Sequence, residues 1–397
     1  MATPELARRD LLRMAVGSAT MLLPRVLSAA GDADFVYFGT YDEGSVAGKG
    51  SKGIYLSRFD TGTGKLTHPE LAAENPNPNW FLIHPNGRTL YVTNELMTAR
   101  GAPPPGTITV FSIDRKTGKL TQTAKIPSGG GQPCHMVFDR TTKMLIVANW
   151  YVGNVAAFPV KKDGSLGSCS ILAPQEGERS GPPAGKPQTH CHSLIVSPDN
   201  RFLLASNTGL NKIFVYGLNA PKCIFTPHDP PFLGFEKPTN PRHMALHPNN
   251  KWIYIANEIA PGGCTMVTFD AANGTLDEGP VFASVPSGAS GRGAQAECVV
   301  HPSGKFVYVS NRGQNSLAVF RVHPSDGNLT LVEAYAPGGQ TPRSFALDPT
   351  GNWLISMMQR TGEVGVHRID QITGKLTDSG QKYNLGAPIC ADFLRIA

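Results

Sequence analysis

Side chains that can move protons or hold anions recur at one position of this sequence, just before short apolar runs. The segments read "QPCH" (132–135), "QTHCHS" (188–193), "NPRH" (240–243), "AQAE" (294–297) and "TPRS" (341–344). A neutral histidine or a carboxylate can take a proton from water, and a guanidinium can meet an oxyanion with two parallel hydrogen bonds. The pattern therefore indicates acid–base chemistry beside a site for negative charge.

A second polar set follows the next apolar run of several copies. It reads "TNE" (93–95), "ANW" (148–150), "ANE" (256–258) and "SNR" (310–312). The recurring Asn is predicted to cap turn backbone groups rather than to contact a ligand. Glu95, Glu258 and Arg312 differ from copy to copy, which makes them candidates for function.

Several common kinds of active site have no counterpart in the sequence. No Gly-rich phosphate loop, serine-nucleophile elbow or cluster of metal ligands stands out. His190 and His192 could be structural histidines bonded to backbone or catalytic ones, whereas a zinc site lacks an identifiable third ligand. We therefore expect neither a metal nor a cofactor.

The elements that position these residues repeat seven times. Strand-like runs are joined by a turn ending in Gly-x-Leu at 58–67, 112–121, 159–167, 268–277, 321–330 and 368–377, and a seventh copy after 214–218 is degraded to "NAPKCI". An Asp/Asn/Gly turn between two short β-rich runs predicts a hairpin. Seven hairpins roughly 50 residues apart predict a β-propeller.

Another repeated element precedes the hairpins and completes each unit. An apolar pair, a Pro-containing turn and an alternating strand occur at 81–94, 136–149, 194–207, 244–257, 298–311 and 345–358. Each unit thus has four strands, which is one blade. The fold class is predicted to be all-β: a seven-bladed β-propeller with four-stranded blades.

The two ends of the chain account for the missing copy of the second element. Residues 387–396 resemble the opening strand of a blade, and residues 33–60 resemble a blade that lacks this strand. Pairing the C-terminal strand with the N-terminal strands would close the ring and remove its open edges. In such a ring His192, Arg242 and Arg343 would meet around one mouth with Glu297 close by.

Composition and the N-terminus suggest where the protein works. The net charge is +6, but the sequence has no run of Lys and Arg residues, so no nucleic-acid partner is expected. Arg8 and Arg9, a short modestly apolar stretch and small residues at 28–30 predict a twin-arginine-type signal peptide over residues 1–30, although the Arg pair could be fortuitous. The remaining residues 31–397 would form a single propeller domain, periplasmic or secreted, with no membrane contact after signal cleavage.

The seven cysteines are too scattered to predict a disulfide framework. Cys134, Cys298 and Cys390 fall in innermost-strand regions, where a small buried side chain is the expected role. The oligomeric state is predicted only as monomer or weak oligomer.

The repeats resemble those of a known family, the seven-bladed propeller lactonases, which include bacterial 6-phosphogluconolactonase and the fungal carboxy-cis,cis-muconate cyclase. The matching runs are "GGQPCHMVFDRTTKMLIVANW", "THCHSLIVSPDNRFLL", "NPRHMALHPNNKWIYIANE", "AECVVHPSGKFVYVSNRG" and "TPRSFALDPTGNWL". They occur in order within residues 34–397. Two departures stand out: Met357 and Met358 replace the usual Asn and its neighbour, which is expected to make that side of the channel more apolar, and Lys186 and Gln188 replace an Arg-Gln pair.

The resemblance implies a lactonase-like hydrolase of carbohydrate metabolism that opens a lactone ring by water attack. The residues expected to be catalytic are Glu258, His192, Arg242 and Arg343. Those expected to bind substrate are His190, His135, His243, Glu297, Arg312 and Glu95. In this assignment Glu258 or His192 is the base, and the arginines hold the oxyanion or a substrate carboxylate.

The expected partner is a small-molecule lactone or sugar acid. Because 6-phosphogluconolactone arises in the cytosol, an exported protein is expected to act on a sugar lactone or a carboxylated lactone. Three alternatives remain open: a non-enzymatic ligand- or protein-binding propeller, a muconate-type lactonising isomerase, and Arg/Glu pairs that serve as salt bridges between blades.

Overall fold

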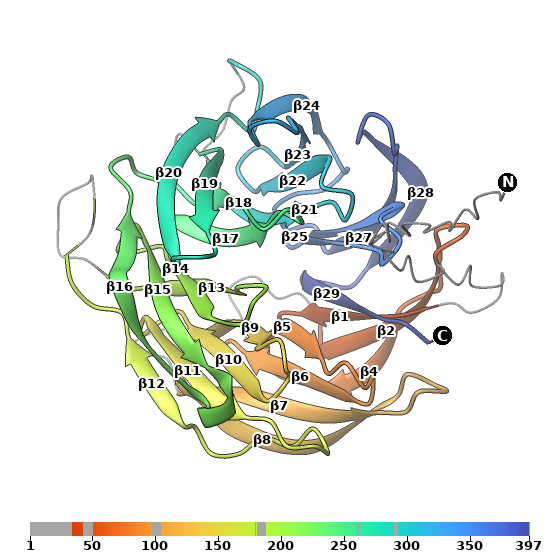
Figure 1. Ribbon diagram of the computed structural model, residues 1–397. Helices are drawn as coiled ribbons and strands as arrows, with labels where there is room; N and C mark the ends of the chain where they lie inside the picture. Colours follow the sequence, from red (N-terminus) through yellow and green to blue (C-terminus); the bar gives the residue numbers. More distant parts are fainter. Residues whose placement is uncertain are drawn as a thin grey trace, which may run out of the picture.

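A computed structural model of the chain describes residues 34–42, 51–96, 105–178, 180, 188–259, 262–288 and 293–396. The described residues form seven antiparallel sheets arranged around a central axis, so the predicted seven-bladed β-propeller is confirmed (Figure 1). The predicted signal peptide at residues 1–30 lies outside the described residues.

Six blades contain four consecutive strands each, and in each blade the strands follow one another in chain order from the axis outward. Blade one is β5 (Pro78–Ile83), β6 (Thr89–Asn94), β7 (Pro105–Ile113) and β8 (Leu120–Gly131). Blade two is β9 (Pro133–Phe138), β10 (Met144–Asn149), β11 (Asn154–Pro159) and β12 (Ile171–Pro174). Blade three is β13 (Cys191–Val196), β14 (Phe202–Asn207), β15 (Lys212–Asn219) and β16 (Ile224–Gly234).

The remaining three of these six blades follow the same order. Blade four is β17 (Pro241–Leu246), β18 (Trp252–Asn257), β19 (Cys264–Asp270) and β20 (Thr275–Phe282). Blade five is β21 (Gln295–Val300), β22 (Phe306–Asn311), β23 (Ser316–Val322) and β24 (Leu329–Tyr335). Blade six is β25 (Pro342–Leu347), β26 (Trp353–Met358), β27 (Glu363–Ile369) and β28 (Leu376–Asn384).

Blade seven joins the two ends of the chain, as predicted. The C-terminal strand β29 (Pro388–Leu394) is innermost and pairs antiparallel with β1 (Asp34–Thr40). Next comes β2 (Gly53–Asp60), which pairs with both short outer strands, β3 (Lys65–Leu66) and β4 (Glu70–Glu74). In Figure 1 the blue C-terminal strand lies beside the red N-terminal strand, and this pairing closes the ring.

The hydrophobic core lies between adjacent blades, because each flat sheet buries both of its faces against its neighbours. Second-strand tyrosines also bond the next blade: Tyr308 Oη donates to the carbonyl of Gly374 at 2.9 Å, and Tyr91 Oη donates to that of Gly164. Gly374 has φ +79°, a conformation that favours glycine. The repeated Gly-x-Leu turn is therefore both a hairpin and a docking point for the preceding blade.

The degraded seventh hairpin has a different connection. Between β15 and β16 the chain makes a short 3₁₀ turn, η1 (Ala220–Lys222), and Cys223 follows in the left-handed conformation at φ 53°. Six cysteines are buried free thiols: Cys134, Cys191, Cys223, Cys264, Cys298 and Cys390. The expected role of Cys134, Cys298 and Cys390 as small buried side chains is confirmed.

Each innermost strand carries one β-bulge near its start, and this shared irregularity positions the site. In blade two, Pro133 pairs with Asn149 and His135 with Ala148, so Cys134 is an extra residue. The same one-residue shift occurs in the other six innermost strands. Because a bulge bends the strand and redirects side chains, successive residues can approach the axis at the same end of all seven blades.

Candidate active site

A backbone hydrogen bond anchors the residue that follows each second strand. Its N–H donates to the carbonyl oxygen of the loop that leads into the innermost strand. The seven donor and acceptor pairs are Tyr41–Ala387, Glu95–Asn77, Trp150–Gln132, Thr208–His190, Glu258–Asn240, Arg312–Ala294 and Gln359–Thr341. The residues of the second polar set are thus held at equivalent places around the mouth of the channel.

The asparagines that end the second strands cap these loops, as predicted. Asn207 Oδ1 accepts the backbone N–H groups of His190 at 3.0 Å and Leu210 at 2.9 Å. Asn149 Nδ2 donates to the carbonyl of Ser128 at 3.1 Å. The asparagine side chains are therefore occupied by the scaffold.

The expectation that Met357 and Met358 make the channel more apolar is wrong. Met357 is fully buried in the hydrophobic cluster between blades six and seven, where it packs with Val36 and Phe38. Met358 is also buried, and its side chain lies close to Gly339 in the incoming loop. An unbranched apolar side chain replaces the capping Asn there, so this change affects packing between blades and loops instead of the pocket.

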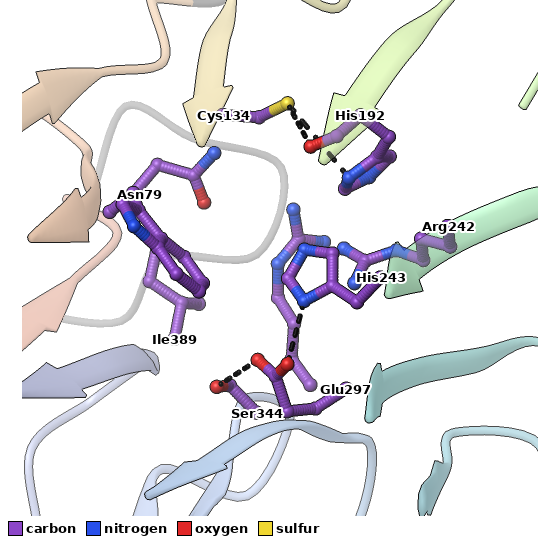
Figure 2. A pocket seen from close by; sticks show the side chains of 10 residues that line it. Asn79, Cys134, His192, Arg242, His243, Glu297, Ser344 and Ile389 are labelled. Carbon is purple, nitrogen blue, oxygen red and sulfur yellow. Dashed lines mark hydrogen bonds and ion pairs between the residues drawn. The ribbon is translucent and has the colours of Figure 1, made fainter. Parts of the chain in front are cut away.

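At least one bulge residue of every blade lines a small polar pocket, which we call the front pocket (Figure 2). Its lining residues are Asn79, Trp80, Cys134, His192, Arg242, His243, Glu297, Arg343, Ser344 and Ile389. They come from all seven innermost strands or their first residues. The free space is about 10 Å³, which is room for roughly one water molecule.

His243 and Glu297 form the central pair of the front pocket. His243 Nδ1 lies 2.8 Å from Glu297 Oε1, and Ser344 Oγ donates to Glu297 Oε2 at 2.9 Å. Burial works to raise the pKa of Glu297, but His243 and the hydrogen bonds lower it below its ordinary value. Burial lowers the pKa of His243, and Glu297 only partly opposes this. At neutral pH an ionised Glu297 therefore accepts Nδ1–H, which leaves the lone pair on Nε2 of a neutral imidazole.

Arg242 and Glu258 belong to a charged cluster between blades four and five. Arg242 is buried and donates from Nη1 to the carbonyl of Ala296 at 2.8 Å, while its Nε lies 3.5 Å from Glu258 Oε1. Arg312 Nη2 donates to the same Glu258 oxygen at 2.6 Å. Burial and the nearby Arg312 lower the pKa of Arg242 to about 10. Burial would raise the pKa of Glu258, but Arg242 and Arg312 hold it below its ordinary value.

Arg343 is held from the opposite side of the mouth. Its Nη2 lies 3.6 Å from Glu95 Oε2, and its guanidinium lies 5.3 Å from the centre of the Tyr41 ring. Tyr41 Oη donates a short hydrogen bond to the same Glu95 oxygen. Burial would lower the pKa of Arg343, yet Tyr41 and Glu95 raise it above its ordinary value. Arg343 therefore stays fully charged with its head at the pocket.

His192 completes the wall of the front pocket beside Cys134. Its Nδ1 lies 3.9 Å from Cys134 Sγ, and its ring centre is 5.1 Å from that of His243. Burial, then Arg242, holds the pKa of His192 well below its ordinary value. Burial also raises the pKa of the Cys134 thiol. Both groups are therefore neutral near pH 7.

Two predicted histidines lie outside the front pocket. His190 stacks on Trp150 with ring centres 3.8 Å apart and planes 3° apart, and its Nδ1 is 3.1 Å from the Trp150 carbonyl oxygen. His135 lies 4.2 Å from Trp80 and 5.6 Å from His243, ring centre to ring centre, and lines a neighbouring cavity instead of the front pocket. Neither side chain lines the pocket, although both touch residues around it.

The predicted residues thus fall into three groups. His192, Arg242, His243, Glu297 and Arg343 line the front pocket. Glu258 pairs with Arg242 and with Arg312, and Glu95 pairs with Arg343. The pair of Arg242 and Glu258 lies within blade four, whereas the other two pairs join different blades, in line with the alternative of salt bridges between blades. His190 and His135 stack on tryptophans.

Two residues with clear roles in the site were not predicted. Tyr41 holds Glu95, and Trp80 lines the pocket with its ring centre 5.3 Å from that of His243 and the two ring planes perpendicular. Both positions carry a signal in the sequence. Trp80 is equivalent to His135 and His243 in the first polar set, and Tyr41 follows the second strand of blade seven as Glu95 follows that of blade one.

Within the described ranges, no group of three or more His, Cys, Asp and Glu residues could hold a metal ion. The same residues include no helix of the length and apolarity that crossing a membrane requires.

The comparison with protein families decides the identity of the chain. Residues 35–393 match the family model described as "Lactonase, 7-bladed beta-propeller". The chain belongs to the seven-bladed β-propeller lactonase family. The family prediction is confirmed, and with it the prediction of a lactonase-type hydrolase.

Relatives of this lactonase are similar over nearly the whole chain. A 6-phosphogluconolactonase of Bacillus subtilis (strain 168) is 31% identical over 358 residues, which cover 90% of this chain and 97% of the relative. A 6-phosphogluconolactonase of Pectobacterium carotovorum subsp. carotovorum (strain PC1) is 31% identical over 297 residues, or 75% and 82% of the two chains. The solved structure of the Pseudomonas aeruginosa periplasmic gluconolactonase superposes with a TM-score of 0.82 at 28% identity, covering 92% of this chain and 99% of that one.

Proposed function

We propose that the protein hydrolyses an unphosphorylated sugar lactone or a carboxylated lactone, with His243 as the general base. The observation that carries this proposal is the His243–Glu297 pair, whose neutral imidazole faces a pocket with room for about one water beside two arginines. A base, a water-sized space and cationic donors are what water attack on a cyclic ester requires.

The reaction can be written with these groups. His243 Nε2 takes a proton from water as its oxygen bonds to the lactone carbonyl carbon, and Glu297 stabilises the resulting imidazolium. Arg343 and Arg242 stabilise the negative charge that forms on the carbonyl oxygen. When the tetrahedral intermediate collapses, the bond to the ring oxygen breaks and the imidazolium returns the proton to that oxygen. The product is the open hydroxy acid.

Glu258 and His192, which the sequence favoured as bases, have less suitable surroundings. Glu258 Oε1 is bonded by Arg312 and lies near Arg242, so its pKa is lowered and it is a weak base. Burial and then repulsion from Arg242 hold the pKa of His192 well below its ordinary value, whereas Glu297 partly offsets the effect of burial on the pKa of His243. We propose that Glu258 positions the two arginines and that His192 contacts the substrate.

The charge balance of the site supports an unphosphorylated substrate. Among the described residues around the front pocket, three arginines (Arg242, Arg312 and Arg343) are matched by three glutamates (Glu95, Glu258 and Glu297), and the histidines are neutral. A phosphate dianion would meet guanidinium groups that already have carboxylate partners. A neutral lactone needs no further cation, and a monocarboxylate needs only one.

The place of action fits the same substrate class. We propose that residues 1–30 direct export by the twin-arginine route and that the mature protein acts in the periplasm or outside the cell. The periplasmic gluconolactonase of Pseudomonas aeruginosa has the same fold and supports this proposal.

The experiment compares acid release from glucono-δ-lactone and from its 6-phosphate by purified residues 31–397. The proposal expects a higher kcat/KM for the unphosphorylated lactone and a loss of turnover in Arg343→Ala. The matched control is Arg201→Ala, because Arg201 lies on the exposed turn at the far end of β13 and β14 and pairs only with surface groups. Faster turnover of the 6-phosphate, or full activity of Arg343→Ala, would reject this assignment.

A further inference from the structure

A second cavity occupies the central channel behind the front pocket, and we call it the rear cavity. Its volume is about 380 Å³, within the range of small-molecule sites. The walls are mostly apolar and include Leu82, Val137, Val299 and Phe345. The rear cavity is therefore large enough for a small molecule, whereas the space enclosed by the side chains of the front pocket has room for about one water.

A thin septum of side chains separates the two cavities. Trp80, Glu297 and Ser344 line both of them. His135 lines the rear cavity and contacts Trp80, and Glu297 is fixed in the septum by His243 and Ser344. The rear cavity is thus distinct from the front pocket, but it shares Glu297 with it.

The charged groups of the rear cavity are all acidic. Two carboxylates, Asp392 and Glu297, face it, and the described lining includes no Arg or Lys. Glu297 already has His243 and Ser344 as partners. Asp392 accepts the backbone N–H of Phe393 at 2.8 Å and that of Ile83, and no cation is among the groups that shift its pKa. Burial raises the pKa of Asp392 to about 7, as expected for a carboxylate in an apolar wall.

We propose that the rear cavity binds a small organic cation, a primary ammonium on a compact apolar body. The ammonium would donate to Asp392, and the apolar body would contact Leu82, Val137, Val299 and Phe345. Charge complementarity and apolar burial both favour this class of ligand over a neutral or anionic one. Binding itself is independent of the proposed function. An effect of the ligand on hydrolysis, through Glu297, rests on that function.

Three probes of one size test the charge preference. Binding of benzylammonium, benzyl alcohol and benzoate to purified residues 31–397 is measured by isothermal titration calorimetry at pH 8. The same titrations use Asp392→Asn, whose amide oxygen can still accept the backbone N–H of Phe393, and Val137→Phe, which fills part of the cavity. Thermal unfolding of each variant checks that it is folded.

The proposal expects benzylammonium to bind and benzoate not to bind. Asp392→Asn should weaken benzylammonium binding by roughly tenfold or more, because a charge-assisted hydrogen bond becomes a neutral one. Val137→Phe should weaken it by occupying the same space. No binding of benzylammonium, equal binding of benzyl alcohol, or unchanged binding by the folded Asp392→Asn variant would each overturn the proposal. Hydrolysis of lactones is measured separately, so failure here leaves the proposed function intact.

Discussion

Replacing the carboxylate that orients the proposed base should slow catalysis without disturbing the fold. In Glu297→Gln, the amide oxygen can still accept His243 Nδ1–H at the 2.8 Å position, and the amide nitrogen can face Ser344 Oγ. What is lost is the negative charge beside the imidazolium that forms as water attacks. We expect kcat to fall while KM changes little.

The size of the effect follows from this contact. A hydrogen bond to a charged group is worth about 1 to 2 kcal/mol more than a neutral one, which corresponds to roughly tenfold in rate. Two charges about 4 Å apart at an effective dielectric constant of about 20 interact by about 4 kcal/mol, which sets a ceiling near 10³-fold. The expected loss in kcat lies between these limits.

The assay is a pH profile of lactone hydrolysis for the variant and for Glu70→Gln, a control at an exposed position on β4. Glu297 raises the pKa of His243 against the effect of burial. Its removal should therefore shift the acidic limb of kcat/KM to lower pH, a change that a purely structural role would not produce. A kcat within twofold of the wild type, with an unshifted limb, would refute the assignment of His243 as the base.

Three further changes test the scaffold of the site and of the ring. Tyr41→Phe removes the hydroxyl bonded to Glu95 and should lower kcat/KM by roughly three- to tenfold, measured by steady-state kinetics. Burial lowers the pKa of His367 to about 4. The contribution of the neutral His367 to stability is therefore complete above the unfolded-state pKa of about 6.5 and is lost as the pH falls towards 4. Between these two pH values, His367→Gln should reduce the pH slope of the unfolding free energy by about 1.4 kcal/mol per pH unit, measured by denaturant titrations. Gly374→Ala should cost about 2 to 4 kcal/mol in the same assay, because φ is +79° and the new Cβ would lie 2.5 Å from the Phe306 ring.

The fold was largely predictable because its signals are local and repeated. Each of the six Gly-x-Leu turns needs a glycine at positive φ, as at Gly374, and these six copies together with the degraded seventh predict the blade number directly. The incomplete repeats at the two ends predicted the closure by β29 and β1. The misread methionines have a physical explanation: Met357 follows the strand alternation into a hydrophobic cluster, and a single sequence does not show which neighbour covers it.

The site was only partly predictable. The repeated polar segments before the innermost strands predicted that Arg242, His243 and Glu297 lie close together, because equivalent positions of a closed ring converge. The pairing among them could not be read from the sequence, since Glu258 could have met Arg242, Arg343 or the substrate, whereas in the structure it meets Arg242 and Arg312. Tyr41 was missed because its blade is divided between the two ends of the chain.

The bulge that every innermost strand shares has a consequence for how such a protein can change its chemistry. Each blade presents a side chain to the axis from the same backbone conformation at its bulge. The hydrogen bonds that hold this part of the chain come mainly from the main chain. The occupant can therefore be exchanged without altering the frame: the equivalent position holds Arg242 in one blade, His192 in another and Ile389 in a third. The ring thus offers seven equivalent side-chain positions around the axis. New specificities can be reached by substituting one of them, such as Ile389, while the other six stay in place.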